Sequence, residues 1–227
     1  MINSDSRLFD EWPEAYDRWF TTPIGSLVRR YELELIMNLL QPKRSEAILD
    51  AGCGTGIFTV DILASGSRVV GLDISLPMLK YAEKKLHRLP FQRVLGDMSY
   101  LPFLESSFDK VVSVTALEFI EDAKEAVGEL FRVTKKGGTI VVATLNSLSP
   151  WASRRMAEAK ERHTLFEKAI FRSPDELRSL ASGDGVVKTA IHFEKSDDPE
   201  TAIGIEQEGC RKDLKTGAFV AVRWTKS

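Results

Sequence analysis

A glycine-rich turn constrains the fold of this chain more than any other feature. The stretch ILDAGCGTGIF, at positions 48–58, is an apolar run that ends in Asp50 and continues through Gly52, Gly54 and Gly56 toward a helix-like segment. Glycines let the backbone turn tightly and leave no side chain between it and a bound ligand. Turns of this kind join a buried strand to a helix, so we expect an α/β fold with a ligand at this turn.

Further short apolar runs alternate with helix-like segments along the chain. The runs are AILDA, SRVVGLD, FQRVLG, KVVSVTAL and TIVVATL. The segments between them carry apolar residues three or four positions apart, which predicts helices at 57–65, 75–89 and 122–135. Apolar strands joined by helices predict a mostly parallel sheet covered on both faces.

The segments that flank these runs have their own signals. Residues 12–41 have apolar positions at helical spacing before Pro42, which predicts a helical N-terminal extension. Ser173-Pro174-Asp175-Glu176 has the sequence of a capped helix start. VVKTAIHFEK and GAFVAVRWTK alternate apolar and polar residues, which predicts an antiparallel pair at the sheet edge.

No linker marks a second domain, so we predict a single domain over residues 1–227. Its expected parts are a helical N-terminal cap (1–42), a ligand-binding core (43–146), a lid (147–172), and a C-terminal helix with edge strands (173–227).

Composition and charge argue against several classes of protein. A formal net charge of -2 does not provide the basic surface that tight nucleic-acid binding needs. The chain has two cysteines, Cys53 and Cys210, and their spacing to histidines matches no zinc site, so we predict no metal. No stretch is long and apolar enough for a membrane span, and we expect a reduced, cytoplasmic setting. The sequence leaves open whether the protein is a monomer or a homodimer.

Acidic residues near the glycine turn indicate the charge of the ligand. Asp50 would repel a pyrophosphate but attract the ammonium and sulfonium of S-adenosylmethionine. Ile57 is too large for the position where a nicotinamide-binding turn has Gly or Ala. Asp73 ends the second apolar run and can accept hydrogen bonds from both ribose hydroxyls. After the third run, Asp97 can accept from the adenine amino group, while Met98 can contact the ring.

Four pieces between Pro42 and Asn146 carry a family resemblance: ILDAGCGTG, VVGLDISLPML, GDMSYLPFLESSFDKVVSVTALEFIED and ELFRVTKKGGTIVVATLN. In order and spacing they resemble class I S-adenosylmethionine-dependent methyltransferases, specifically the small-molecule group related to ubiquinone and menaquinone biosynthesis enzymes. The resemblance implies a Rossmann-like three-layer sandwich with a seven-stranded sheet whose last strand is antiparallel. It also implies S-adenosylmethionine as cofactor and S-adenosylhomocysteine as product. The predicted cofactor-binding residues are Asp50, Gly52, Cys53, Gly54, Gly56, Asp73, Ile74, Asp97, Met98 and Thr115.

Aromatic residues outside these motifs are candidates for contacts with the methyl acceptor. Tyr16, Trp19 and Phe20 precede the first strand, in the region that covers the cofactor in related enzymes, although ordinary helix packing explains them equally well. Phe119 and Trp151 complete the predicted set. Many relatives have His where this chain has Phe119, so a mechanism with a base at that position does not transfer.

No catalytic residue is assigned from the sequence. Methyl transfer from a sulfonium needs alignment of the acceptor more than it needs a base. If a proton must be removed, Tyr16, Glu118 and His163 are candidates.

The leading hypothesis is a methyltransferase acting on a small-molecule acceptor. A cofactor-binding regulatory subunit without catalysis and a protein or RNA methyltransferase remain as alternatives. Asp50 and Ile57 disfavour a nicotinamide-dependent oxidoreductase.

Overall fold

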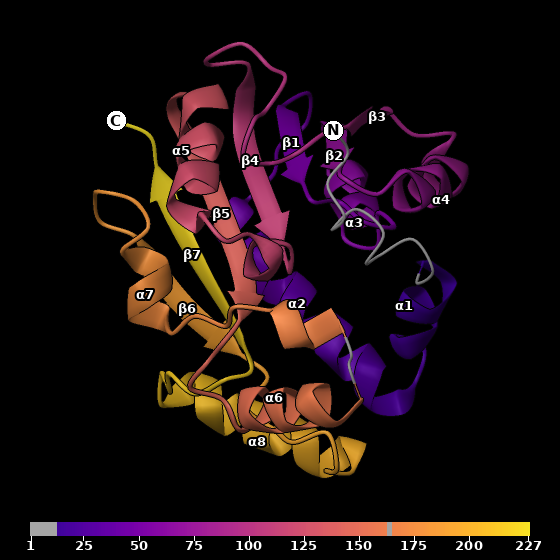
Figure 1. Ribbon diagram of the computed structural model, residues 1–227, viewed down its shortest axis with the longest axis vertical. Helices are drawn as coiled ribbons and strands as arrows, with labels where there is room; N and C mark the ends of the chain where they lie inside the picture. The colour runs from indigo at the N-terminus through magenta and orange to yellow at the C-terminus, as the bar shows by residue number, and fades with distance from the viewer. Residues whose placement is uncertain (1–12, 163–164) are drawn as a thin grey trace.

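The centre of the molecule is a seven-stranded sheet with the strand order β3-β2-β1-β4-β5-β7-β6 (Figure 1). The structure is a computed structural model that describes residues 13–162 and 165–227. Its strands are β1 (Ala47–Ala51), β2 (Arg68–Asp73), β3 (Phe91–Leu95), β4 (Phe108–Val114), β5 (Thr134–Leu145), β6 (Val186–Ala190) and β7 (Phe219–Thr225).

The strand directions confirm the predicted Rossmann-like sheet. β1 to β5 pair in parallel, whereas β7 pairs antiparallel with both β5 and β6. From β1 the chain adds β2 and β3 on one side and then returns to place β4 on the other. Ligands of open α/β sheets bind at the carboxyl ends of the strands beside such a reversal.

Helices connect the strands and cover the sheet. They are α1 (Pro13–Trp19), α2 (Pro23–Leu40), α3 (Thr59–Ala64), α4 (Leu76–Leu86), α5 (Ala123–Val133), α6 (Pro150–Arg162), α7 (Pro174–Arg178) and α8 (Pro199–Arg211), with the short 3-10 helices η2 (Leu117–Phe119) and η3 (Leu165–Lys168). The three helices predicted between the early strands are confirmed as α3, α4 and α5. Among the described residues, every helix is too short or too polar to cross a bilayer.

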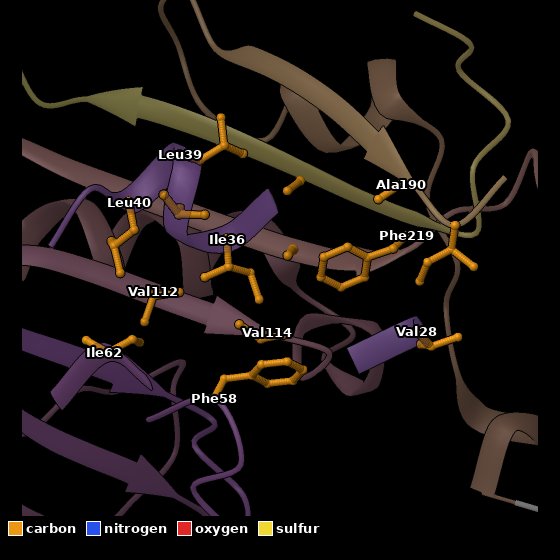
Figure 2. Close-up of a cluster of buried hydrophobic side chains, with 14 of the residues drawn as sticks. Val28, Ile36, Leu39, Leu40, Phe58, Ile62, Val112, Val114, Ala190 and Phe219 are labelled. Carbon is orange, nitrogen blue, oxygen red and sulfur yellow. The ribbon is translucent and has the colours of Figure 1, made fainter. Parts of the chain in front are cut away.

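Alternating residues of the strands divide the apolar interior into two cores, one on each face of the sheet. On β4, Val112 and Val114 belong to the core that contains side chains of α2 and α3, as Figure 2 shows. Their neighbour Val111 belongs to the core under α5 and α7. Because the central strands are buried on both faces, their sequences are continuous apolar runs rather than alternating ones.

The predicted N-terminal helical extension consists of two helices. Thr22 caps α2 by accepting a hydrogen bond from the Gly25 N–H at 3.1 Å, and Pro23 occupies the first turn. A Cβ on Gly25 would lie 2.1 Å from the Trp19 carbonyl oxygen, so the chain bends sharply between the helices. As a result α1 lies apart from the sheet, whereas α2 packs on β5, β6 and β7.

The C-terminal part contains one predicted helix start and one helix that the sequence patterns did not reveal. Ser173 and Glu176 form the expected capping box at α7. The unexpected helix, α8, begins with the same kind of signal, since the Asp198 side chain accepts hydrogen bonds from the N–H groups of Glu200 and Thr201. The strand expected over VVKTAIHFEK ends earlier than the apolar pattern, at Ala190. In the sheet, β6 is the edge strand and β7 lies in the interior between β5 and β6.

Candidate cofactor and acceptor site

A cavity of about 1370 Å³ opens at the carboxyl ends of β1, β2 and β4. Pockets for one drug-sized ligand measure roughly 300–1,000 Å³, so this cavity has room for two small molecules. Its walls come from α1, α2, the glycine turn, η2, α6 and η3. In Figure 1, α6 lies beyond the arrowhead of β5, at this end of the sheet.

The three glycines of the turn have different roles. Gly52 has φ +79°, and a Cβ there would lie 2.4 Å from Cβ of Ala116 in the segment after β4. Gly54, with φ +52°, lines the cavity, and a Cβ added to it would meet no atom within 4 Å. Gly56 does not line the cavity and faces Leu86 of α4 instead. Gly56 allows α4 to pack closely against the turn, and the expected cofactor contact at this glycine stays a prediction.

Asp73 ties the glycine turn to the start of α4. One carboxylate oxygen accepts from the Gly54 N–H at 2.8 Å, and the other accepts from the N–H of Ser75, the cap of α4, at 2.9 Å. A carboxylate oxygen can accept more than one hydrogen bond, so Asp73 can hold the turn and still receive a ligand hydroxyl.

Asp50 is buried at the end of β1, with 3% of its surface exposed. It accepts a hydrogen bond from the Thr59 hydroxyl of α3 at 2.6 Å. Burial raises the pKa of Asp50 to about 7, and the nearby charge of Asp73 adds to the rise. A cation bound in the cavity would favour the ionised carboxylate and lower this pKa again.

The remaining predicted cofactor residues also line the cavity. Asp97 accepts from the Ser99 N–H at 2.8 Å, and Met98 is buried beneath Gly52. Thr115 adopts φ +47°, and its hydroxyl lies 3.5 Å from the Tyr16 hydroxyl. The other two lining residues of this set are Cys53 and Ile74. Burial raises the pKa of the Cys53 thiol well above its usual value, which does not suit a nucleophile.

The distribution of charge along the cavity fits a cationic adenosyl ligand. Asp50, Asp73 and Asp97 lie where the strands end, beside the open position at Gly54. The basic residues that line the cavity come from the segments after β5: Arg154, Arg155, Lys168 and Lys195. A pyrophosphate over the glycine turn would meet acidic side chains, whereas a sulfonium and an ammonium are attracted there. The residues therefore fit S-adenosylmethionine.

Three of the aromatic residues predicted as acceptor contacts form one cluster in the wall of the cavity. Tyr16 and Trp19 each pack edge-on against Phe20, with ring centroids 5.2 and 4.7 Å apart. Phe20 in turn lies 6.1 Å from Phe58, which follows the glycine turn. All five predicted acceptor residues line the cavity, including Phe119 and Trp151.

Two buried glutamates face the same cavity. Glu32 of α2 is 5% exposed, and burial raises its pKa to about 8. Glu118 of η2 is 1% exposed, and burial raises its pKa to about 7. The sequence prediction included Glu118 only as a candidate base and missed Glu32. The available signal was the position of Glu32, four residues from both Val28 and Ile36 on the buried face of α2.

Arg155 of α6, in the segment predicted as a lid, completes this group but was not among the predicted site residues. Its guanidinium lies 5.1 Å from the ring centroid of Trp151 and 5.4 Å from that of Phe166. Its positive charge acts on both glutamates and lowers their pKa values against the effect of burial. No sequence pattern joins Arg155 to α2 and η2, because only the tertiary fold brings these elements together.

The other candidate bases are less suitable. Burial raises the pKa of Tyr16 well above its usual value, and the charge of Glu32 adds to the rise, so its hydroxyl stays protonated near neutral pH. His163 lies outside the described residues.

Away from the cavity, the fold brings together three residues that no sequence motif connects. The potential metal-ligand atoms of His192, Glu206 and Cys210 lie within 4.8 Å of one another. The Glu206 carboxylate accepts hydrogen bonds from the N–H groups of Ile191 and His192, at 3.1 and 2.7 Å, and from the Cys210 thiol. These hydrogen bonds explain the cluster as a contact that fixes α8 to the end of β6.

The fold and the acidic strand-end cavity together define a Rossmann-like methyltransferase. Comparison with known proteins agrees, since a family model described as "Methyltransferase domain" matches residues 49–142. Malonyl-acyl-carrier-protein O-methyltransferase of Pectobacterium atrosepticum is 30% identical over 200 residues, which cover 78% of this chain and 76% of that protein. The chain belongs to the S-adenosylmethionine-dependent methyltransferase family, whose cofactor is S-adenosylmethionine.

Two further comparisons extend this assignment. Demethylmenaquinone methyltransferase of Renibacterium salmoninarum is 34% identical over 138 residues, 60% of this chain, which spans only 56% of that relative. A crystal structure from Thermotoga maritima, titled "SAM-dependent methyltransferase, possible histamine N-methyltransferase", has a TM-score of 0.73 and 25% identity. That alignment covers 97% of this chain and 99% of the other, so the similarity includes the N-terminal helices and the C-terminal strands.

Proposed function

We propose that this protein transfers a methyl group from S-adenosylmethionine to a small-molecule acceptor. The observation that carries the proposal is that two chemically different groups of residues line one cavity. We assign the acidic strand ends and the open Gly54 position to the cofactor end, and the aromatic side chains from α1 and α6 to the acceptor end. The volume of about 1370 Å³ accommodates a cofactor and an acceptor together.

The residues divide into two groups under this proposal. Asp73 and Asp97 bind the ribose and the adenine, and Asp50 favours the positive charge of the ligand. When bound, S-adenosylmethionine supplies a methyl group already activated on a sulfonium. The protein therefore has to align the acceptor and exclude water, which we assign to the aromatic lining residues Tyr16 and Trp151.

A small acceptor is favoured over a nucleic acid or a protein. The net charge of -2 provides no general attraction for a phosphate backbone. The acceptor end is lined by buried side chains such as Phe20, Glu118 and Trp151, which a large polymer could reach only with a flexible end. The names of two relatives, a demethylmenaquinone methyltransferase and a malonyl-acyl-carrier-protein O-methyltransferase, support a small chemical group as the methyl acceptor.

Two measurements test the proposal. Isothermal titration with S-adenosylhomocysteine is expected to show one binding site per chain. If the folded protein does not bind S-adenosylhomocysteine, the proposed function is wrong. Incubation with tritiated S-adenosylmethionine and separated fractions of a cell extract should label the small-molecule fraction. Label in RNA or protein supports the macromolecular alternative, and binding without label in any fraction supports a regulatory subunit.

A further inference from the structure

One polar atom in the acceptor end of the cavity is buried and has no partner among the described residues. It is Oε1 of Glu118, a residue that lines the cavity and is 1% exposed. The other oxygen of the same carboxylate accepts from the Thr144 hydroxyl at 2.9 Å. A buried carboxylate oxygen without a donor is costly, which indicates that a ligand supplies the missing hydrogen bond.

The surroundings of Glu118 hold it in place. Arg172 donates to the carbonyl oxygens of Leu117 at 3.1 Å and Ile120 at 3.3 Å, so its guanidinium braces the turn that carries Glu118. The N–H of Ile170 donates to the Glu118 carbonyl oxygen at 2.7 Å. The carboxylate is therefore a fixed group on a fixed turn, as a binding residue must be.

The charges around this position favour a cationic ligand. Glu32 from α2 and Glu118 from η2 provide two carboxyl groups, and the charges of Arg155 and Arg172 lower the pKa of Glu118. Burial nevertheless raises the pKa of Glu32 to about 8 and that of Glu118 to about 7, so the arginines do not fully offset the cost of ionising the two carboxyl groups. A positive ligand lowers that cost.

We propose that the methyl acceptor is a small amine with an aromatic or apolar body, and that its nitrogen binds at Oε1 of Glu118. The body of the amine lies among Tyr16, Phe20 and Trp151, and Glu118 acts as the catalytic base. This inference rests on the proposed function, because it assigns the acceptor of the same cavity.

The chemical step balances with these groups. An amine enters as the ammonium, and one N–H bond breaks as its proton passes to Oε1 of Glu118. The N–H electron pair stays on nitrogen and forms the new bond to the methyl carbon, while the sulfonium sulfur keeps the pair of the broken C–S bond. A base is most effective when its pKa lies near the working pH, and the pKa of Glu118 is raised to about 7.

Other acceptor chemistries fit less well. A carboxylate would add negative charge beside Glu32 and Glu118, and it would bring an acceptor rather than a donor to Oε1. A phenol or alcohol can donate to Oε1 but brings no positive charge to the two carboxyl groups. Only a cationic donor satisfies both the unpaired atom and the charge.

The test compares three probes that share a phenethyl body and differ in the charge of the head group: phenethylamine, phenethyl alcohol and hydrocinnamate. Each is titrated into the full chain saturated with S-adenosylhomocysteine, near pH 8. We expect the amine to bind at least about tenfold more tightly than either analogue. The substitution Glu118→Gln keeps the shape of the side chain and should weaken amine binding by about tenfold or more, with cofactor affinity within about twofold.

The matched control is Glu34→Gln, which removes an exposed carboxylate from the helix that carries Glu32. It should leave the affinity for amine and for cofactor unchanged. Amine binding no tighter than that of its analogues overturns the inference, as does equal loss of cofactor and amine affinity in Glu118→Gln. Failure of S-adenosylhomocysteine to bind the wild-type chain instead overturns the proposed function, so the two failures are distinguishable.

A pH series provides a second readout. The groups that act on Glu118 are Tyr16 of α1, Glu32 of α2, Arg155 of α6 and Arg172 before α7. Amine affinity should rise as pH increases through about 7, because Glu118 ionises while the amine stays protonated. The rise should be reduced in Glu118→Gln, and an unchanged pH profile in that variant counts against the inference.

Discussion

Asp73 has contacts within the fold as well as a place in the proposed cofactor site. Its two oxygens accept from the N–H groups of Gly54 and Ser75, which belong to the glycine turn and the cap of α4. A residue with these contacts cannot be treated as a ligand contact alone. Removing its carboxylate changes the shape of the binding turn as well as the charge.

We therefore expect Asp73→Asn to weaken S-adenosylhomocysteine binding by about ten- to a hundredfold, since the amide provides one acceptor where two N–H groups need one each. Titration calorimetry measures the change. Asp184→Asn, in an exposed turn, is the control and should bind as the wild type does. Normal affinity in Asp73→Asn would contradict the role of Asp73 in the site.

The glycine turn offers a second test at single residues. Gly54→Ala places a methyl group toward the cavity at φ +52°, so it should lower cofactor affinity by about tenfold and cost about 1–2 kcal/mol of stability. Gly52→Ala drives its Cβ against Ala116 and should destabilise the fold more than Gly54→Ala does.

Thermal unfolding and cofactor titration separate the two effects. Gly128→Ala on α5 is the control, because its Cβ meets open space at helical φ and should stabilise slightly. If Gly52→Ala and Gly54→Ala lose the same amount of stability, the packing of Gly52 against Ala116 does not distinguish it from Gly54.

At the scale of elements, the buried carboxylate of Glu206 connects α8 to the end of β6. Glu206 accepts from the N–H groups of Ile191 and His192, and Ile191 adopts φ +65°, an unfavourable conformation for a β-branched residue. Burial lowers the pKa of His192, but its hydrogen bond and charge interaction with Glu206 outweigh this and the pKa is raised. The contact holds the strained residue where β6 ends.

Glu206→Ala leaves those two N–H groups without their acceptor and should cost about 2–4 kcal/mol. Urea denaturation measures the loss. Glu206→Gln retains one acceptor and should cost less, whereas Glu208→Ala on the exposed side of α8 should leave the midpoint unchanged. A Glu206→Ala midpoint equal to that of wild type would show that α8 docks by its apolar contacts alone.

The sequence predicted elements well where their signals are local. The sheet core, α3 to α5 and the cap at Ser173 follow from apolar spacing and turn chemistry. The missed α8 has an equally local cap at Asp198, but its apolar face is weak because Gly204 and Gly209 interrupt it. The candidate site shows the same difference between local and distant signals. The acidic residues at the strand ends could be predicted from the sequence, whereas Arg155 and Glu32 come together only when the distant helices α6 and α2 pack in the fold.

At the scale of the whole molecule, buried carboxyl groups connect stability to pH. Burial, with the charge of Glu118, raises the pKa of Glu32 to about 8, while an unfolded glutamate titrates near about 4.3. At a pH between these two pKa values, Glu32 is ionised in the unfolded chain but still protonated in the folded chain. Stability from this group is therefore complete below the unfolded pKa and is lost as pH rises through the folded one.

The stability difference between Glu32→Gln and wild type should shift in favour of the variant by about 2–4 kcal/mol from near pH 5 to near pH 9. Urea denaturation without cofactor measures it, and Glu34→Gln should show no such shift. The comparison isolates Glu32, because Asp50 and Glu118 are present in both proteins. A pH-independent difference would mean that Glu32 is ionised throughout.

The interior position of β7 has a consequence for how the protein forms during synthesis. Phe219–Thr225 is the strand that joins β6 to β5, so the ribosome must translate these residues before the sheet can close. Until they emerge, β5 exposes an unpaired edge, and α2 lacks part of the surface that it packs against. Nascent chains stalled before Phe219 should therefore be targets for chaperones that recognise open sheet edges.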